Sequence, residues 1–307
     1  MGWLFGCALR EAGDVVCWGD IKDPPEGSFV QLAAGRNNGV CGLRPSGEVS
    51  CWGRGGKPPK GHFGQVAGGL THFCGIREDG SLSCWGESEF DIDRSEGPFV
   101  DVAVGRGNLC AIRADQSLSC VGYGIPGEYT PPPGTFVEVD MGNYVACAIR
   151  TTGETVCWGR SVPEEVWQAR SSGELEGAER MAGTVLNQPM RQMAMPGPAG
   201  SGLAAAAGMG IGPVLERKTV ENQKLLEVPP ERFVSLSVGL AGACGLREDG
   251  VLSCWGELTT ASACNRPGRV RSVAAGAGAG CAVSAEDGRI GCWGWDEHGQ
   301  TTPPGMD

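Results

Sequence analysis

The chain has 307 residues, of which 52 are glycine and 20 are proline, and only 7% are aromatic, which is typical of many short strands joined by tight turns. A formal net charge of −11, with no long run of lysine or arginine, argues against a nucleic-acid partner, because phosphate binding requires a basic stripe. The opening MGWLFGCALR lacks the features of a signal peptide, and the most apolar stretch, Pro198 to Pro213, is too short and glycine-rich for membrane insertion.

One unit recurs seven times: a cysteine is followed ten or eleven residues later by a second cysteine, usually within Cys-Trp-Gly. Self-similarity at this period indicates that one supersecondary unit was copied and stacked. The seven pairs are Cys7 and Cys17, Cys41 and Cys51, Cys74 and Cys84, Cys110 and Cys120, Cys147 and Cys157, Cys244 and Cys254, and Cys281 and Cys292.

The third unit, from Cys74 to Cys84, predicts a β-hairpin in which the two cysteines face each other. Its Glu-Asp-Gly loop places glycine at the last position, where a three-residue hairpin loop needs a left-handed residue. Centring the loop on Asp79 puts the cysteines at a non-hydrogen-bonded pair, where side chains approach most closely. In the fourth unit Gln116 replaces the glycine, and we expect that turn to be slightly strained.

Facing cysteines in every unit favour seven disulfides and an oxidising compartment. Two other interpretations remain open: buried free thiols, since cysteine packs well in cores, and metal ligands. The metal interpretation is weaker because it needs Cys-x-x-Cys spacing or nearby histidines, and the chain has only His62, His72 and His298. Seven bridges would leave Cys264 unpaired among the 15 cysteines.

A further strand precedes six of the seven hairpins. In one of them Val100, Val102 and Val104 alternate with smaller or polar residues, and the strand ends in small residues, as expected where strands crowd near a central axis. Three strands with their turns account for a period of 33 to 37 residues, so each sheet should be thin. The six segments are residues 29–35, 63–69, 99–105, 136–142, 233–239 and 270–276.

These units predict an all-β fold: a seven-bladed β-propeller with thin, mostly three-stranded blades, because a ring covers both faces of every sheet. Blade 1 is expected to be incomplete, since the seven hairpins have only six preceding strands. The chain ends TTPPGMD, and Pro-Pro precedes the additional strand in several units. We therefore favour the interpretation that the chain is a fragment of a longer protein.

The repeat is interrupted once. Successive first cysteines are 34, 33, 36, 37, 97 and 37 residues apart, so the long spacing falls between the fifth and sixth units. Residues 161–228 contain no cysteine and include the low-complexity stretch MAMPGPAGSGLAAAAGMGIGP. We expect a largely disordered insertion there, with blades 1–5 in residues 1–160 and blades 6–7 in residues 229–307.

The pattern Phe-Val-x-Val-Ala-x-Gly, then Cys-Ala-Leu, Asp-Gly and Cys-Trp-Gly, resembles the regulator of chromosome condensation repeat. It is similar in particular to the cysteine-paired variant of secreted bacterial proteins, such as propeller-type β-lactamase inhibitor proteins, and of crinkly-type receptor kinase ectodomains. The resemblance covers nearly everything outside residues 161–228 and implies a seven-bladed propeller. Its relatives differ in function, so it does not identify a ligand. The family's Gly-Gln after the Trp-Gly strand survives only as Gly299-Gln300, and no basic tail is present, which disfavours a nuclear role.

The chain shows no constellation of catalytic residues, so we expect neither an enzyme nor a cofactor. The three histidines lie in different units and no Gly-x-Ser-x-Gly motif occurs. Asp79 and Asp249 lie in predicted turns, where turn chemistry explains an aspartate.

We expect instead an extracellular or surface-exposed module that binds a protein, or a glycan, through the loops between its strands. The alternative is an intracellular exchange-factor-like or scaffold propeller with reduced cysteines. The segments just before each first cysteine vary most, as a recognition surface would on a fixed frame. Candidate ligand-binding residues are Asn37, Asn38, His72, Arg106, Asn108, Asn143 and Tyr144 in those segments, together with Tyr123 and Trp295, which break the repeat register.

Overall fold

The computed structural model describes residues 4–21, 23–35, 38–86, 97–122, 130–142, 145–159, 227–240, 242–256, 268–276 and 278–304. The chain divides into two compact units, one formed by Met1–Ser161 and Lys224–Asp307 and the other by Val162–Gln223. All described residues lie in the first unit. Except for residues 227 and 228, the predicted insertion lies outside them, as does Cys264, so the domain boundaries and the state of that cysteine stay predictions.

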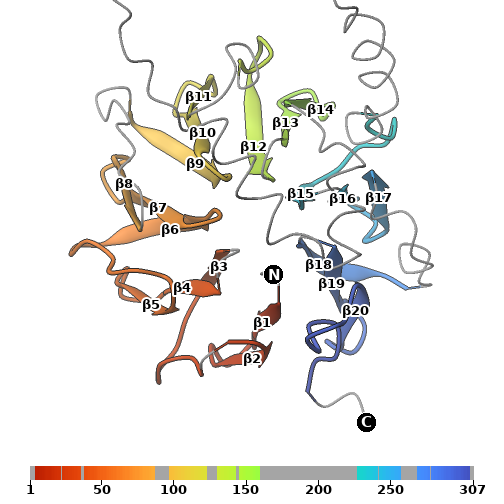
Figure 1. Ribbon diagram of the computed structural model, residues 1–307. Coiled ribbons are helices and arrows are strands. Elements are labelled where there is room, and N and C mark those ends of the chain that lie inside the picture. The colour runs from red at the N-terminus through yellow and green to blue at the C-terminus, as the bar shows by residue number, and fades with distance from the viewer. Residues whose placement is uncertain are drawn as a thin grey trace, which may run out of the picture. The chain divides into compact units, whose positions relative to one another are not determined.

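The described residues form 20 strands and no helix, and therefore no helix there is long and apolar enough to cross a membrane. The strands make seven antiparallel sheets around a common centre, as the blades of a propeller (Figure 1). Six sheets have three strands in chain order and the first has two. The predicted all-β propeller with seven thin blades is confirmed, and within the described residues blade 1 has the expected two strands.

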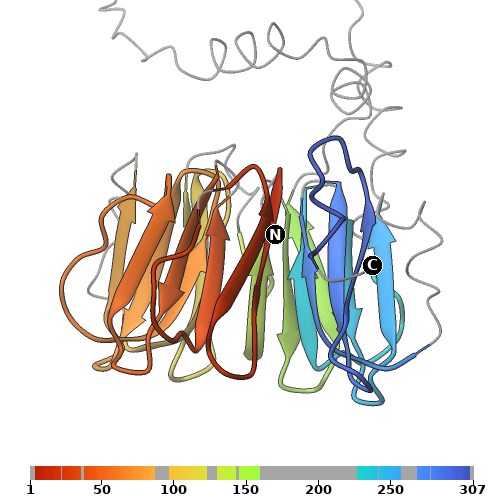
Figure 2. The same ribbon diagram turned by 90° about the horizontal axis from the view of Figure 1, so that it is seen from below.

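Each complete blade has an inner strand beside the centre, a middle strand and an outer strand, and all run roughly parallel to the propeller axis (Figure 2). Blade 1 has a middle and an outer strand, β1 (Phe5–Leu9) and β2 (Val15–Gly19). Blades 2 to 4 are β3 (Gln31–Gly35), β4 (Gly39–Leu43) and β5 (Val49–Gly53); β6 (Phe63–Gly68), β7 (His72–Arg77) and β8 (Leu82–Gly86); and β9 (Phe99–Val104), β10 (Asn108–Arg113) and β11 (Leu118–Gly122). Blades 5 to 7 are β12 (Phe136–Met141), β13 (Val145–Arg150) and β14 (Thr155–Gly159); β15 (Ser235–Val238), β16 (Gly242–Leu246) and β17 (Leu252–Gly256); and β18 (Val270–Ala275), β19 (Ala279–Ser284) and β20 (Ile290–Gly294).

Every hairpin has the register expected from its loop. Cys74 lies opposite Cys84, and in blade 7 Cys281 lies opposite Cys292 despite the longer loop. All seven predicted pairs form disulfides, with Cα atoms 4.0 or 4.1 Å apart. The disulfide interpretation is therefore confirmed over the thiol and metal interpretations for these 14 cysteines.

The hairpin turns also follow the sequence. Gly80 closes its turn with a φ of +80°, a conformation that glycine adopts without a steric penalty. Gln116 occupies the equivalent place in blade 4 with a φ of +69°, so it carries the strain that the sequence predicts.

The hydrophobic core is distributed between the blades rather than within them. Seven clusters of buried residues occur, and each combines residues of two neighbouring blades. In one of them Cys41 and Leu43 of blade 2 pack with Phe63 and Trp85 of blade 3. Because each disulfide faces the next blade, a blade buries its covalent bridge only when its neighbour is in place.

The last of these clusters closes the ring between blades 7 and 1. Trp18 of blade 1 is buried with Cys281 and Cys292 of blade 7. Its indole Nε1 donates a hydrogen bond of 2.8 Å to the main-chain oxygen of Gln300, and the Gln300 side chain is itself buried. The dipeptide Gly299-Gln300, which follows the Trp-Gly strand of blade 7, therefore lies where the two ends of the described chain meet.

Candidate functional site

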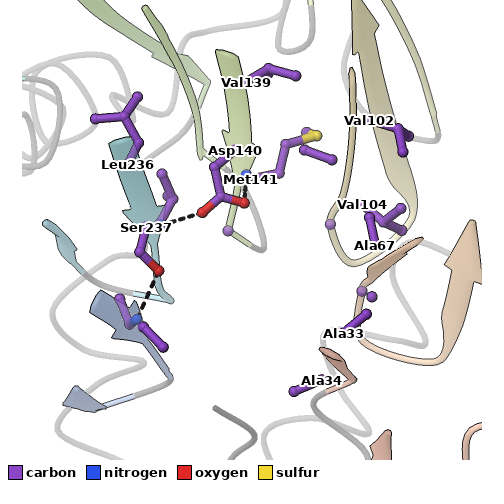
Figure 3. A pocket seen from close by; sticks show the side chains of 18 of the residues that line it. Ala33, Ala34, Ala67, Val102, Val104, Val139, Asp140, Met141, Leu236 and Ser237 are labelled. Atoms are coloured by element: carbon purple, nitrogen blue, oxygen red, sulfur yellow. Dashed lines mark hydrogen bonds between the residues drawn. The ribbon is translucent and has the colours of Figure 1, made fainter. Parts of the chain in front are cut away.

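The inner strands surround a cavity of about 580 Å³ at the centre of the ring (Figure 3). Its lining residues come from β3, β6, β9, β12, β15 and β18 and from the residues that follow these strands. Most of them are alanine, glycine or valine, and the charged ones, Asp101, Glu138 and Asp140, are all acidic. The sequence indicated small residues near the axis, but it gave no sign of a function for the polar ones.

We call this central cavity the channel. Its polar side chains connect each inner strand to the next one. Asp101 of β9 accepts hydrogen bonds from the Gln65 amide on β6 (2.6 Å), from its own neighbour Val102 (2.9 Å) and from the Val139 main-chain N–H on β12 (2.9 Å). An inner strand has one edge without a strand partner, so its N–H groups need other acceptors. The side chain of the preceding blade provides one.

The same arrangement continues around the ring. Glu138 accepts from the Leu236 N–H at 2.8 Å, and Asp140 accepts from the Val238 N–H at 2.6 Å. Ser237 then accepts from the Ala275 N–H at 2.8 Å, and Figure 3 shows Asp140 and Ser237 reaching across to their neighbouring strands. In blade 2 the acceptor is a neutral side chain, because the Gln31 amide oxygen accepts a hydrogen bond from the Val66 N–H at 3.0 Å.

Burial raises the pKa values of two carboxyl groups in the channel. The pKa of Glu138 is raised to about 7, mainly by desolvation and also by the negative charges of Asp140 and Asp101, while the hydrogen bond from Leu236 opposes the change. Desolvation also raises the pKa of Asp101, against the lowering effect of its three hydrogen bonds. A perturbed carboxyl in a cavity can indicate catalysis. Here one oxygen of each carboxyl accepts a hydrogen bond from a backbone N–H of the neighbouring blade, so the first role of these side chains is structural.

The chemistry available in the channel is limited. The lining residues include acceptors and methyl groups but no lysine, arginine or histidine, so an anion would find no countercharge there. Within the described residues, no group of three or more His, Cys, Asp or Glu side chains is arranged to hold a metal ion.

A collar of glycines closes around one end of the channel. The last position of each inner segment is glycine, and five of these residues approach the backbone of the next blade: Gly35, Gly69, Gly105, Gly142 and Gly239. A Cβ atom on Gly105 would lie 2.6 Å from the Gly142 carbonyl oxygen, and one on Gly142 would collide with the Gly239 carbonyl oxygen. Only glycine permits this approach, so the collar fixes the positions of the loops that follow it.

The variable loops start at this collar, and several predicted ligand residues share its face. The outer strands end on the same face, because Arg54 donates to the Asn38 oxygen and Trp295 donates to the Gly278 oxygen. Asn38 and Arg106 are half-buried in the loops, and Trp295 is 40% exposed. Topology therefore places these three candidates on one face of the ring, while the hairpin turns occupy the other.

Two other candidates are the first residues of the middle strands β7 and β10. His72 is 1% exposed and Asn108 is fully buried, so a ligand would reach them only if the loops moved. Desolvation lowers the pKa of His72 to about 4, which keeps its ring neutral at neutral pH. Asn37, Tyr123, Asn143 and Tyr144 lie outside the described residues, so their predicted role stays a prediction, as it does for the other candidates.

The comparison with family models identifies the repeat. Residues 65–91 match the model of the regulator of chromosome condensation (RCC1) repeat. The propeller therefore contains an RCC1-like repeat in blade 3. No curated protein sequence matches this chain.

Solved structures agree with the fold. The CRINKLY WD40 ectodomain of the receptor kinase ACR4 from Arabidopsis thaliana is similar with a TM-score of 0.64 and 19% identity, covering 98% of this chain and 92% of that one. The ectodomain of the receptor kinase CR4 from Physcomitrella patens has a TM-score of 0.64 and 23% identity over 95% of this chain and 71% of its own. Prp20p from Saccharomyces cerevisiae, studied for its binding to Gsp1p and histones, has a TM-score of 0.56 and 14% identity over 88% of this chain and 73% of its own.

We predict that replacing a collar glycine with alanine destabilises the protein, whereas the same replacement outside the collar does not. We expect Gly142→Ala to lower the free energy of unfolding by about 2 kcal/mol, because the new Cβ would overlap a neighbouring backbone oxygen. Gly107→Ala is the matched control, since a Cβ there would meet nothing within 4 Å. Urea unfolding with intact disulfides measures both. Equal effects of the two substitutions would contradict the role of the collar.

The raised pKa of Glu138 predicts that the free energy of unfolding depends on pH. Glu138 has a native pKa of about 7 and an ordinary value of 4.5, so the native state holds more protons between these values. Its contribution to the free energy of unfolding therefore falls as pH rises from 4.5 to 7. Glutamine can still accept from Leu236, so we expect Glu138→Gln to stabilise the protein by about 3 kcal/mol at pH 8 and by little at pH 4.5.

Denaturant unfolding of the wild type and of Glu138→Gln at the two pH values measures this difference. Glu78→Gln, at an exposed hairpin turn, is the control and should change the free energy of unfolding by less than about 0.5 kcal/mol at either pH. A benefit of Glu138→Gln that is equal at both pH values would rule out a proton bound at Glu138.

Proposed function

We propose that this RCC1-like propeller is a non-catalytic module that binds another protein outside the cell or at its surface. The observation that carries the proposal is the set of seven disulfides, one in each blade. Disulfides in this number persist in oxidising compartments and are reduced in the cytosol. Such a compartment disfavours the intracellular exchange-factor-like or scaffold role.

The ring consists of a fixed frame that carries variable loops, and this arrangement supports the proposed binding function. The blade interfaces, the channel links and the glycine collar hold the starting points of the loops, whereas the loop sequences differ from blade to blade. Recognition residues generally lie on loops held by a rigid scaffold. Arg106 and Trp295 are of the residue types enriched at binding hot spots, and Trp295 is an exposed aromatic residue.

The similar structures fit this proposal without establishing it. Two of them are ectodomains of plant receptor kinases, but their identities of 19% and 23% show a common fold alone. The carboxylates of the channel are engaged by backbone N–H groups, which leaves little for catalysis there.

If the protein matures in an oxidising compartment, nearly all of its cysteines should be unavailable to an alkylating reagent. After alkylation without reductant, we expect mass spectrometry of the natively produced protein to show one modified site, because 14 of the 15 cysteines are paired. After reduction, all 15 should react. Modification at many sites before reduction would favour the reduced intracellular alternative.

The loop face predicts which substitutions weaken binding. In a pairwise screen against purified secreted and cell-surface proteins, we expect a specific partner whose Kd rises at least about tenfold in the double variant Arg106→Ala, Trp295→Ala. The control double variant Glu48→Ala, Glu78→Ala changes hairpin turns on the opposite face and should bind normally. A partner lost only in the hairpin variant would place the binding surface on the wrong face for this proposal.

A further inference from the structure

Three exposed valines lie on the face of the ring that carries the hairpin turns, which we call the hairpin face. Each is the second residue of an inner segment: Val100 in blade 4, Val137 in blade 5 and Val234 in blade 6, which are neighbouring blades (Figure 1). The N–H of Phe136, one residue before Val137, donates a hydrogen bond to the main-chain oxygen of Gln116 in the preceding hairpin turn. The inner strands therefore begin on the hairpin face, and we call these three residues the valine arc.

A β-bulge exposes the valines. In blade 5 the residues on either side of Val137 lie opposite Arg150 and Ile149, which are consecutive, so Val137 has no partner on β13. The register of blade 4 skips Val100 in the same way. A bulge turns its extra residue out of the ladder. Val100, Val137 and Val234 are 58%, 55% and 54% exposed, whereas the phenylalanine before each of them is buried. Apolar side chains exposed together on one face mark an interaction site.

The valine arc borders one end of the channel. The residues that follow Val100 and Val137 are Asp101 and Glu138, which line the channel and are only partly buried, so water reaches them. At the other end the five collar glycines are all buried. The channel is therefore open to solvent on the hairpin face, beside the valines.

The channel has hydrogen-bond acceptors that lack donors. Ser235 and Leu236 both donate to Oε1 of Glu138, and among the described residues Oε2 accepts no hydrogen bond. Gln65 Oε1 is buried and accepts none either. Since no lysine, arginine or histidine lines the channel, a positively charged group with several N–H donors is the chemistry that these acceptors fit.

We propose that the valine arc and the adjoining end of the channel form a second binding site, which takes a partner polypeptide segment with a lysine or arginine between apolar residues. The cationic group would enter the channel and donate to Glu138 Oε2, and the apolar residues would cover the valines. Lysine and arginine suit this place because their apolar stems can pass the valines while the charged group reaches the acids.

The two parts of the site together define the occupant. A free amine or an inorganic cation would leave the valine arc exposed, and a purely apolar segment would leave the acceptors of the channel unsatisfied. The site is on the face opposite the variable loops, so it does not depend on the function proposed above.

The probe is a phage-displayed library of random heptapeptides, selected on the full chain with intact disulfides and depleted on the double variant Val137→Thr, Glu138→Gln. We expect the enriched peptides to share a lysine or arginine flanked by apolar residues. A fluorescein-labelled peptide of that sequence should bind saturably by fluorescence anisotropy, and each single substitution should raise its Kd about tenfold. Glutamine at position 138 can still accept from Leu236, so the lost binding would not result from unfolding.

Matched controls change the same residue types away from the site. Val251→Thr alters a 42% exposed valine beside the blade 6 hairpin turn, and Glu78→Gln alters an exposed acid of the blade 3 hairpin turn. Neither should change the Kd of the peptide. The loop-face double variant Arg106→Ala, Trp295→Ala should also bind it normally, which separates this test from that of the proposed function.

Four results would overturn the proposal. Enriched peptides without a basic residue, or no enrichment at all, would remove the cationic occupant. A Kd that Glu138→Gln leaves unchanged would exclude the channel from the site. A dimer in solution that Val137→Thr dissociates would make a second copy the occupant. A clear drop in the urea midpoint of Val137→Thr would mean that the chain covers the valine arc itself.

Discussion

The blades of this propeller depend on contact between neighbouring sheets, because each buried hydrophobic cluster combines residues of two adjacent blades. A thin sheet of two or three short strands cannot bury both of its faces alone. Each disulfide holds its hairpin in register and presents the bridge to the next blade, where phenylalanine and tryptophan cover it. The ring is the arrangement that gives every sheet two neighbours, and the contact of Trp18 with blade 7 completes it.

A second constraint acts at the centre of the ring. Inner strands have one edge without a strand partner, and their N–H groups are satisfied by side chains of the preceding blade, such as Asp101 and Glu138. This explains why acidic residues occupy a half-buried channel although burial raises their pKa. The strands can converge only because their last residues are glycines. Together these features make the centre a structural element and leave the loops around it free to vary.

Blade 1 is the exception to the second constraint. Its hairpin is closed against blade 7 by Trp18 and Gln300, so the ring holds together there. Its inner edge and Arg10 nevertheless have no inner strand beside them within the described residues.

The sequence by itself determined the local geometry of the repeat. A period of two along each strand and the length of each loop place Cys74 opposite Cys84, and the same reasoning identifies Gln116 as a strained turn residue, because these features depend on neighbours within a few residues. Only the tertiary structure decided what the ring brings together from distant parts of the chain. Trp18 meets Gln300 across 282 residues, and Asp140 meets Val238 across 98. The burial of His72 and Asn108, which the sequence offered as ligand contacts, was decided in the same way, because packing between blades sets exposure and no local pattern encodes it.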